Sequence, residues 1–452
     1  FPMVSSVHAR IEESGDGRYS IIHLSRSNPT LRNDEVVRQS APIEVGDVVR
    51  LGYTGPVIEI LGLSSHAADD SGESAGFNQT IEADARHLAL LRGSSESRQF
   101  DLGNGGVIGR ERDEVSFLLN HPHVSRQHAR IVVSDNRIVI KDLGSANGTF
   151  VNGERISHTV ELDSGDRIDI GPFSLRLEGA TLISRSRSNN IELSARRISR
   201  AVIQRGSGQP LILVADVDLV VRPREFVCLL GPSGSGKSTL MNILSGRNAP
   251  NRGIVGLNGE NLYENFEAFK EDLAVVPQRD ILPTALSVRD ALRYTAALRL
   301  PADSDPDEID DAVSDILEVV GLTERSETLI KNLSGGQLKR VSLANELVAR
   351  PSVLFLDEVT SGLDEQTDGE IMQLFRQVAD GGKTVVCITH NLAHVESACH
   401  LVVILTEGGK TAFIGKPREA CDYFGISRLG DVYLKLSEKN PDAWLAQFRA
   451  SP

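Results

Sequence analysis

The pattern of apolar and polar positions divides the chain into two kinds of segment. Up to about residue 190, short runs such as RIVIKDL (137–143) and FSLRLEG (173–179) are separated by Gly, Asn, Asp and Pro. Short strand-like runs between turn residues are typical of small all-β sandwiches. From about residue 191, apolar runs alternate with helical patterns, as where FVCLLGP (226–232) enters a Gly-rich turn. This second part is expected to have an α/β fold with an inserted helical stretch.

One helix of that stretch can be predicted in detail. In PDEIDDAVSDILEVVGL (306–322), Pro306 and Asp307 open the segment and Gly321 closes it. The apolar residues between them recur at helical spacing on one face: Ile309, Val313, Ile316, Leu317 and Val320. An amphipathic helix is therefore expected.

The β part contains a repeat. VSSVHARI (4–11) resembles VSRQHARI (124–131), and similar segments follow each octet at nearly the same spacing: SNPTLRND (27–34) and ANGTFVNG (146–153), then GDVVRLG (46–52) and GDRIDIG (165–171). The second copy is preceded by GGVIGRERDEVSFLLN (105–120), whereas the chain begins at the first copy. We expect two related β modules, with the first truncated and residue 1 not the natural start.

Composition shifts mark the expected boundaries. Residues 64–84 are small, polar and acidic, as in flexible linkers. The predicted divisions are a truncated β module (1–63), a linker (64–97), a complete β module (98–180), a short linker (181–190), an α/β domain (191–425) and a C-terminal extension (426–452).

Charge and hydropathy exclude some functions. The formal net charge of −14 argues against broad nucleic-acid binding, which needs a basic face. No apolar run reaches the 18 or more residues of a membrane span, and no secretory signal opens the chain. The four cysteines have no CxxC spacing, which suits a reduced, cytosolic setting. This chain is therefore expected to be soluble as it stands.

A phosphate-binding loop follows the strand at 226–230. GPSGSGKS (231–238) matches GxxxxGK[ST] between a strand and a helical run, the context that this motif requires. The glycines let backbone N–H groups close around phosphate oxygens, Lys237 adds a charge, and Ser238 can ligate Mg²⁺. VLFLDE (353–358) ends a second strand with two carboxylates, Asp357 as a metal partner and Glu358 as a base for water.

A second anion-binding helix start lies in NLSGGQLKR (332–340). A serine followed by two glycines presents backbone N–H groups and a hydroxyl to an anion. Because the chain already has one phosphate loop, this second one indicates a ligand shared between two subunits.

These motifs together resemble the nucleotide-binding domain of ATP-binding cassette (ABC) transporters over residues 191–425. The family's motifs occur in order: Walker A at 231–239, Gln278 in VVPQRD, the signature LSGGQ at 333–337, Walker B at 353–358, SGLD at 361–364 and the switch histidine His390 in CITHN. The resemblance implies ATP and Mg²⁺ as cofactors.

The same resemblance implies the site residues. Nucleotide contacts would come from Gly231, Pro232, Ser233, Gly234, Ser235, Gly236, Lys237, Ser238 and Thr239, and from the partner subunit's copies of Ser334, Gly335, Gly336, Gln337 and Asp364. Mg²⁺ would be held by Ser238, Gln278 and Asp357, and catalysis would fall to Glu358, His390 and Gln278. The family's adenine-stacking aromatic is missing from AVIQRGSGQPLIL (201–213), where Ile203 is an aliphatic substitute.

The β modules resemble forkhead-associated (FHA) domains, which are phosphothreonine-binding sandwiches. IGR (108–110), SRQH (125–128) and NGTFVNG (147–153) carry the resemblance. It implies that Arg110 and Ser125 hold the phosphate, Arg126 adds charge and Asn147 holds the peptide backbone, with Gly109 and His128 architectural. The first copy keeps Ser5, His8 and Asn28 but has Ser6 in place of Arg126, which leaves its binding open.

The combination resembles the cytosolic half of mycobacterial-type FHA-containing ABC exporters. It implies ATP-driven export regulated by phosphothreonine and Ser/Thr kinases, a head-to-tail homodimer, a transmembrane domain outside this chain and a place at the cytoplasmic face of the plasma membrane. KPREACDYFG (416–425) and NPDAWLAQF (440–448) resemble the stretch before such membrane helices, or form an ordinary amphipathic helix. Thr80 and Thr181 are candidate phosphorylated ligands.

Two alternatives stay open. A soluble ABC ATPase acting on nucleic acid or ribosomes usually has two cassettes or a long coiled-coil insertion, unlike this acidic chain with one cassette. A phosphopeptide scaffold with an inactive cassette is at odds with intact Lys237, Glu358 and His390. The transported substrate cannot be inferred from these residues.

Overall fold

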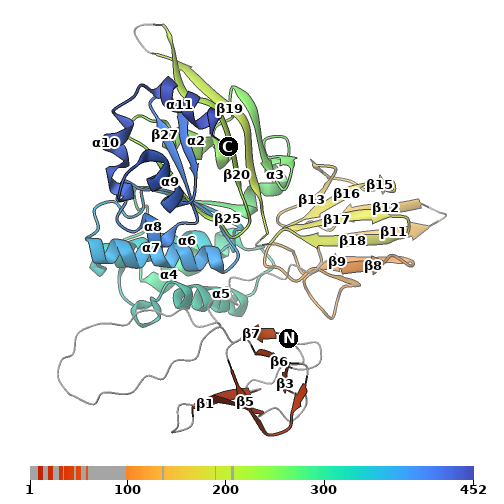
Figure 1. Ribbon diagram of the computed structural model, residues 1–452. Helices are drawn as coiled ribbons and strands as arrows, with labels where there is room; N and C mark the ends of the chain where they lie inside the picture. Colours follow the sequence, from red (N-terminus) through yellow and green to blue (C-terminus); the bar gives the residue numbers. More distant parts are fainter. Residues whose placement is uncertain are drawn as a thin grey trace. The chain divides into compact units, whose positions relative to one another are not determined.

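The computed structural model describes residues 9–13, 19–23, 30–33, 35–44, 47–51, 57–59, 98–134, 137–188, 190–204 and 208–451. The chain separates into two compact units, Phe1–Thr80 and Ile81–Pro452, which are described one at a time (Figure 1). Ser5, Ser6, His8, Asn28, the expected linker at 64–97 and Thr80 all lie outside the described residues.

The first unit consists of two small antiparallel sheets. One has the order β1 (Ala9–Glu13), β2 (Tyr19–His23), β5 (Ser40–Ile43), and the other β4 (Glu35–Val37), β3 (Thr30–Arg32), β6 (Val48–Leu51), β7 (Val57–Glu59). Their shared core contains Ile21, Val37, Ile43 and Val49, each alternating with polar or more exposed neighbours. This is the expected β module.

The second β module is a complete sandwich. Its first sheet has the order β10 (Phe117–Leu118), β9 (Gly105–Gly109), β11 (Ala129–Ser134), β12 (Arg137–Asp142), β15 (Val160–Leu162). The second has the order β14 (Glu154–Arg155), β13 (Thr149–Val151), β16 (Arg167–Ile170), β17 (Phe173–Glu178), β18 (Thr181–Ser186), β8 (Arg98–Asp101). The order β11-β12-β15 with β14-β13-β16-β17 repeats that of β1-β2-β5 with β4-β3-β6-β7, so the repeated sequence has a repeated topology.

The sequence prediction of a linker at 181–190 needs correction. Thr181–Ser186 forms β18, which pairs antiparallel with both β17 and β8. The alternation in TLISRS explains this, because Leu182 and Ser184 are buried while their neighbours are more exposed. Thr181 therefore lies within the sheet, opposite Asp101 and Glu178, and not in a segment after the module.

The α/β part is built on two sheets. The antiparallel one has the order β20 (Pro210–Val221), β19 (Leu193–Ile203), β22 (Arg252–Leu257), β23 (Glu260–Asn261). The central one has the order β24 (Leu273–Val276), β25 (Val353–Asp357), β26 (Thr384–Ile388), β21 (Phe226–Leu230), β27 (Leu401–Thr406), β28 (Lys410–Gly415), parallel except for the last pair.

Both faces of the central sheet are covered, which explains its unbroken apolar strands. On one face, Phe226 and Leu354 pack with the helices α4 (Val288–Arg299), α5 (Pro306–Val319), α6 (Gly335–Leu347) and α7 (Glu365–Asp380) (Figure 1). On the other, Val227 and Phe355 pack with the antiparallel sheet and α2 (Lys237–Leu244). Two short helices add to these cores, α8 (Val395–Ala398) to the first and α3 (Phe266–Phe269) to the second.

The predicted helix at 306–322 is α5, which ends three residues earlier at Val319. Asp305 caps it by accepting a hydrogen bond from the Glu308 amide, and the Glu308 side chain accepts one from the Asp305 amide. Gly321, at φ +68°, turns the chain away after the last helical turn.

The C-terminal extension packs onto the α/β domain. It comprises α10 (Val432–Leu436) and α11 (Pro441–Ala450), which follow α9 (Pro417–Phe424) of the α/β domain, and α11 lies against β28. Trp444 is 1% exposed, donates to the Leu436 carbonyl at 3.0 Å and packs 5.0 Å from the Phe424 ring. Among the described residues, no helix combines the length and the apolar character that a membrane span requires.

Candidate nucleotide and phosphothreonine sites

The Walker A loop joins β21 to α2 in a conformation that requires glycine. Gly231, Gly234 and Gly236 have φ of +148°, +80° and +85°. A Cβ at Gly236 would collide with the Leu213 carbonyl oxygen, and one at Gly231 with that of Leu405. The loop therefore keeps its backbone amides in a tight turn at the start of α2, the geometry that binds phosphate oxygens.

Lys237 is already directed into this loop. Its Nζ atom donates to the carbonyls of Gly231 and Pro232, at 2.8 and 3.0 Å. Burial lowers the pKa of Lys237, and the carboxylates of Glu358 and Asp357 oppose that shift. Burial and the neighbouring Glu358 raise the pKa of Asp357. The charges of Lys237, Asp357 and Glu358 therefore influence one another.

Glu358 lies between the other two predicted catalytic residues. Gln278 Nε2 donates to Glu358 Oε2 at 2.6 Å, and His390 Nε2 lies 2.9 Å from Glu358 Oε1. Glu358 has φ of +49°, an unfavourable conformation for a residue with a side chain. The three residues come from the ends of neighbouring strands β24, β25 and β26, so the parallel sheet brings them together.

The signature stretch forms the N-terminus of α6. Ser334 caps the helix, with its Oγ accepting from the Gln337 amide at 3.3 Å while Gln337 Oε1 accepts from the Ser334 amide at 3.0 Å. Ser334 and Gly335 are exposed. A Cβ at Gly336 would collide with the Thr367 methyl group, so α6 and α7 approach closely here. Asp364 caps α7 through Thr367 within the same chain.

Sequence reasoning missed the residue that joins α6 to the Gln278 loop. Lys339, 9% exposed, donates to the Gln278 carbonyl at 3.2 Å and pairs with Asp280 at 2.8 Å. Ser342 also donates to Asp280, at 2.6 Å. An inward-facing lysine just after LSGGQ was the available signal, because a buried lysine needs a partner.

An apolar cavity is lined mainly by β19 and β20, which contain most of the segment 201–213 where adenine recognition is expected. Its volume is about 530 Å³, and its lining includes Val202, Ile203, Pro210 and Ile212 from β19 and β20. Ile203 is 69% exposed and Ile212 51%, which is unusual for large apolar side chains. The close approach of Gly236 to the Leu213 carbonyl places β20 beside the phosphate loop.

The FHA motifs converge at one end of the second β module. The Arg110 amide donates to the Ser125 carbonyl at 3.2 Å, and a Cβ at Gly109 would collide with the Arg126 carbonyl. His128 is fully buried, accepts from the Ser125 amide at its Nδ1 and lies 3.1 Å from the Gly148 carbonyl through Nε2. Ser125 Oγ accepts from the Ala146 amide at 3.2 Å.

The histidine contacts fix its protonation state. Because Nδ1 accepts a hydrogen bond from an amide, His128 is neutral with its own proton on Nε2. Burial lowers its pKa, in keeping with that state. Asn147 donates to the His123 carbonyl at 2.9 Å, so the fourth predicted residue also lies at this end of the module.

The two arginines predicted to bind phosphate contact acidic residues at the start of α5. Arg110 pairs with Glu308 through both guanidinium Nη atoms and lies 3.5 Å from Asp303. The Arg126 backbone amide donates to Asp303 Oδ2 at 2.5 Å, and the Arg126 side chain donates through Nη2 to Asp305 Oδ2 at 2.8 Å. Nothing in the sequence motifs indicated these partners, which lie almost 200 positions further along the chain.

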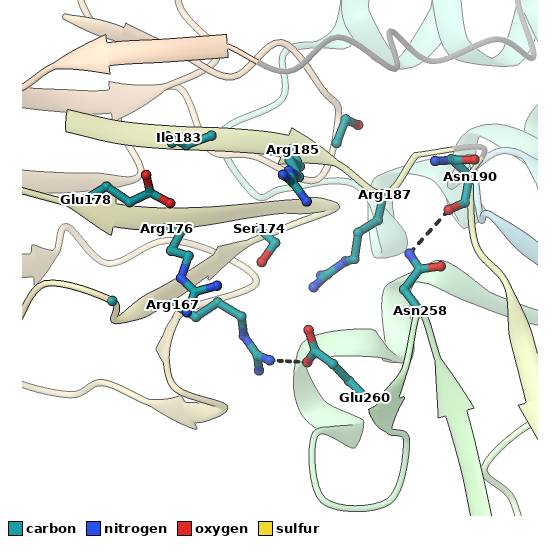
Figure 2. Close-up of a pocket in the computed structure, with 12 residues that line it drawn as sticks. Arg167, Ser174, Arg176, Glu178, Ile183, Arg185, Arg187, Asn190, Asn258 and Glu260 are labelled. Carbon is teal, nitrogen blue, oxygen red and sulfur yellow. Dashed lines mark hydrogen bonds and ion pairs between the residues drawn. The ribbon is translucent and has the colours of Figure 1, made fainter.

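A second contact joins the β module to the α/β domain at a cavity of about 620 Å³ (Figure 2). Figure 2 shows Arg167 pointing toward Glu260, with which it forms an ion pair. Arg187, almost fully buried, donates to Asp169 at 2.8 Å and to the Ala268 carbonyl at 3.3 Å. Its guanidinium lies 4.7 Å from the centre of the Phe269 ring. The module is thus held against the α/β domain by arginines that are already paired.

Buried titratable groups lie along the same contact. Burial lowers the pKa of His121 and brings that of His123 to about 4, and the charges of Lys383 and Arg350 from the α/β domain add to both shifts. Burial, with Arg350, lowers the pKa of Lys383 to about 7, against the effect of Asp272.

Comparison with known protein families identifies both parts. The model described as ABC transporter matches residues 214–361, and the FHA domain model matches residues 1–52 and 106–171. The chain therefore combines FHA domains with an ABC-type ATPase cassette. This confirms the family resemblance and the fold classes predicted from the sequence.

Two curated relatives agree with these matches. An ABC transporter ATP-binding/permease protein of Mycobacterium tuberculosis is 36% identical over 77% of this chain and 40% of its own length. ABC transporter G family member 13 of Arabidopsis thaliana is 39% identical over 49% of this chain and 33% of its own length. A solved dimeric bacterial ABC transporter cassette aligns with a TM-score of 0.44 and 25% identity, over 50% of this chain and 98% of its own. The chain thus spans less than half the length of the curated relatives it matches.

Proposed function

We propose that this chain binds and hydrolyses ATP as the cytoplasmic part of an ABC exporter, and that its FHA domains recognise phosphothreonine to regulate it. The observation that carries the ATPase half is the position of Glu358. It lies at the end of β25 between Gln278 and His390, and its charge reaches Lys237 of the phosphate loop. A carboxylate held at that place can orient and deprotonate the attacking water.

Residues of the phosphate loop and of the ends of the neighbouring strands also fit a magnesium ion. Ser238 offers a hydroxyl and Asp357 a carboxylate, the oxygen ligands that Mg²⁺ prefers. Burial and the adjacent Glu358 charge raise the pKa of Asp357, and a bound cation would offset both effects. Ser238, Asp357 and Gln278 would hold the ion, which neutralises charge on the phosphate oxygens when bound. Lys237 would turn from the loop carbonyls to the nucleotide phosphates.

The nucleotide would be shared between two copies of the chain. Ser334 and Gly335 are exposed at the start of α6, where backbone amides and a hydroxyl can meet an anion from outside. A head-to-tail dimer would place Ser334, Gly335, Gly336, Gln337 and Asp364 of one copy opposite the Walker A loop of the other.

The exporter role rests on the relatives. Their names describe ABC transporters, and one of them combines ATP-binding and permease functions. Since this chain spans only part of their length, the membrane domain, the location at the plasma membrane and any kinase partner belong to the proposal. Arg110, Ser125, Arg126 and Asn147, gathered around one loop end, support phosphothreonine as the ligand.

The test is ATP hydrolysis by the whole chain with and without Mg²⁺. Lys237→Ala should abolish turnover and nucleotide binding, because it removes the charge at the phosphates. Wild-type chain that binds ATP yet shows no magnesium-dependent turnover at any protein concentration would contradict the ATPase half. Equal binding of a phosphothreonine peptide pool and its unphosphorylated counterpart would contradict the regulatory half.

A further inference from the structure

The residues proposed to hold phosphothreonine are covered by the cassette of the same chain. We call residues 301–308, PADSDPDE, the acidic turn. The Arg110 side chain is 9% exposed, and the acidic turn supplies most of its partners. Ser125 is 7% exposed. A phosphate in water cannot reach Arg110 while the acidic turn is in place.

The contacts of the acidic turn are those expected of a bound anion. Glu308 pairs with both guanidinium Nη atoms of Arg110, and Asp303 accepts from the Arg126 amide. Asp305 adds an ion pair at 2.8 Å to the Arg126 guanidinium. Three carboxylates thus contact two arginines and a backbone N–H, which is the set of donors that a phosphate dianion would use.

We propose that the acidic turn is an internal competitor for the phosphothreonine site, so that a phosphothreonine ligand binds the second FHA domain only by displacing residues 301–308. This rests on the proposed phosphothreonine recognition and names how that same site is regulated. The displaced element is part of the cassette, so the two halves of the chain communicate through one set of arginines.

Displacement is feasible because the carboxylates fit the site incompletely. Arg110 Nε is buried and has no hydrogen-bond partner within the described residues, although a buried guanidinium donor without an acceptor is costly. Planar carboxylates from three separate residues leave this donor unused. A tetrahedral phosphate with three acceptor oxygens can offer it an acceptor while replacing Asp303 and Glu308.

The fold holds the acidic turn close to the phosphothreonine site, and this determines how strongly the turn competes with an external ligand. The capping box of α5 fixes the acidic turn. Separately, Arg187 holds the β module against the cassette through the Ala268 carbonyl and the Phe269 ring. A tethered competitor acts at a high effective concentration. The apparent affinity for an external ligand then equals its intrinsic affinity multiplied by the fraction of molecules that are open. Only a ligand that satisfies both arginines well should then bind.

The acidic turn is also connected, through α5, to the helices that pack beside the signature stretch. α5 packs against α4 and α6, and α6 begins at Gly335, directly after its cap Ser334. Release of the acidic turn therefore frees the N-terminal end of α5 from the FHA domain, next to the helix that completes a partner's nucleotide site.

The test uses the whole chain with a peptide pool that has a fixed central phosphothreonine, and the same pool with threonine. Asp303→Asn with Glu308→Gln removes two charges but keeps the cap of α5, since the new side-chain amide at position 308 still has an oxygen that accepts from the Asp305 amide. Asp307→Asn with Asp311→Asn is the matched control, because both residues are exposed on the same helix. The first variant should bind the phosphorylated pool about tenfold more tightly than wild type, and the control variant should match wild type.

Hydrogen exchange gives a second readout. The phosphorylated pool should raise amide exchange at residues 301–308 of the wild-type chain, and the unphosphorylated pool should not. If the double variant folds poorly, Asp303→Asn alone replaces it in the test. This single variant leaves the α5 cap untouched and should give a smaller gain in affinity for the phosphorylated pool.

Two results overturn the proposal and can be told apart. Equal affinity of wild type and the acid variants for the phosphorylated pool, with exchange at 301–308 unchanged, rejects competition and leaves phosphothreonine recognition standing. No preference of any variant, including the opened one, for the phosphorylated pool rejects phosphothreonine recognition itself.

Discussion

The Nε2 atom of His390 lies 2.9 Å from Oε1 of Glu358, although one follows β26 and the other follows β25. The pair is held by parallel strand registry, which places Asp357 opposite Ile388. Glu358 adopts φ of +49° to turn its carboxylate toward His390 and Gln278. Such strain, of the order of 1–3 kcal/mol, persists only where the surrounding structure fixes the residue.

Glu358→Gln should separate binding from hydrolysis. The amide keeps the shape of the side chain but cannot accept the proton of the attacking water, so turnover should fall by about 10²- to 10⁴-fold. ATP with Mg²⁺ should then hold the variant as a head-to-tail dimer, measured by multi-angle light scattering. Glu324→Gln, at an exposed site, is the control. A variant that stays monomeric at saturating ATP would weaken the shared-site proposal.

Ser334→Arg should preserve nucleotide binding and block turnover. Ser334 is exposed at the start of α6, so a long side chain there would project into the space that a partner's nucleotide must occupy. Ser334→Ala removes the helix cap, at about 1 kcal/mol of stability, and the proposed hydroxyl contact, but it adds no bulk, so it separates these losses from steric obstruction. The measurements are nucleotide binding and steady-state hydrolysis. Native turnover by Ser334→Arg would show that the signature stretch does not complete another subunit's site.

Ile203→Ala should weaken ATP binding about threefold to tenfold. The exposed Ile203 side chain lines the apolar cavity of β19 and β20, and burying it under an adenine ring would remove apolar surface from water. Ile254→Ala, also exposed but on β22 and outside the cavity lining, should leave the affinity unchanged. Titrations with ATP and GTP would also measure base selectivity. Identical affinities of both variants would place adenine elsewhere.

Motifs that act through local backbone geometry could be predicted from the sequence. GPSGSGKS determines a loop because its glycines adopt φ values that other residues avoid, and VLFLDE determines a buried strand with acids at its end. The parallel sheet then brings Gln278, Glu358 and His390 together. The FHA motifs converge for a similar reason, since Gly109 permits close approach to Arg126.

Features that depend on contacts distant in sequence could not be predicted. The acidic turn has the composition of an exposed helix start, and only the fold brings Asp303 and Glu308 to Arg110 and Arg126. The sequence of Thr181–Ser186 favours a linker because two serines and an arginine outweigh its alternation, yet pairing with β8 and β17 stabilises it as a strand. Trp444 packs into the cassette core from α11, and the sequence of this helix alone does not indicate which surface of the cassette it contacts.

Acid should destabilise the contact between the second FHA domain and the cassette. His121, His123 and His128 are buried there or beside it, and burial holds each pKa below the ordinary value of 6.5. Between pH 6.5 and the folded-state pKa, which is about 4 for His123, the unfolded chain binds more protons than the folded one. The free energy of unfolding therefore falls as pH falls through this window, by up to about 1.4 kcal/mol per pH unit for each histidine.

His123→Asn isolates one of these contributions from the carboxylates that titrate in the same range. The variant should lose some stability at about pH 7.5, because a packed ring is removed, but its stability should fall less steeply between about pH 6.5 and 4.5 than that of the wild type. Urea unfolding at intervals of half a pH unit measures both slopes. His158→Gln, at an exposed position of the same domain, should keep the wild-type slope. Equal slopes for His123→Asn and wild type would mean that His123 takes up its proton in the folded state as readily as in the unfolded one, and would contradict its burial as a neutral side chain near Lys383 and Arg350.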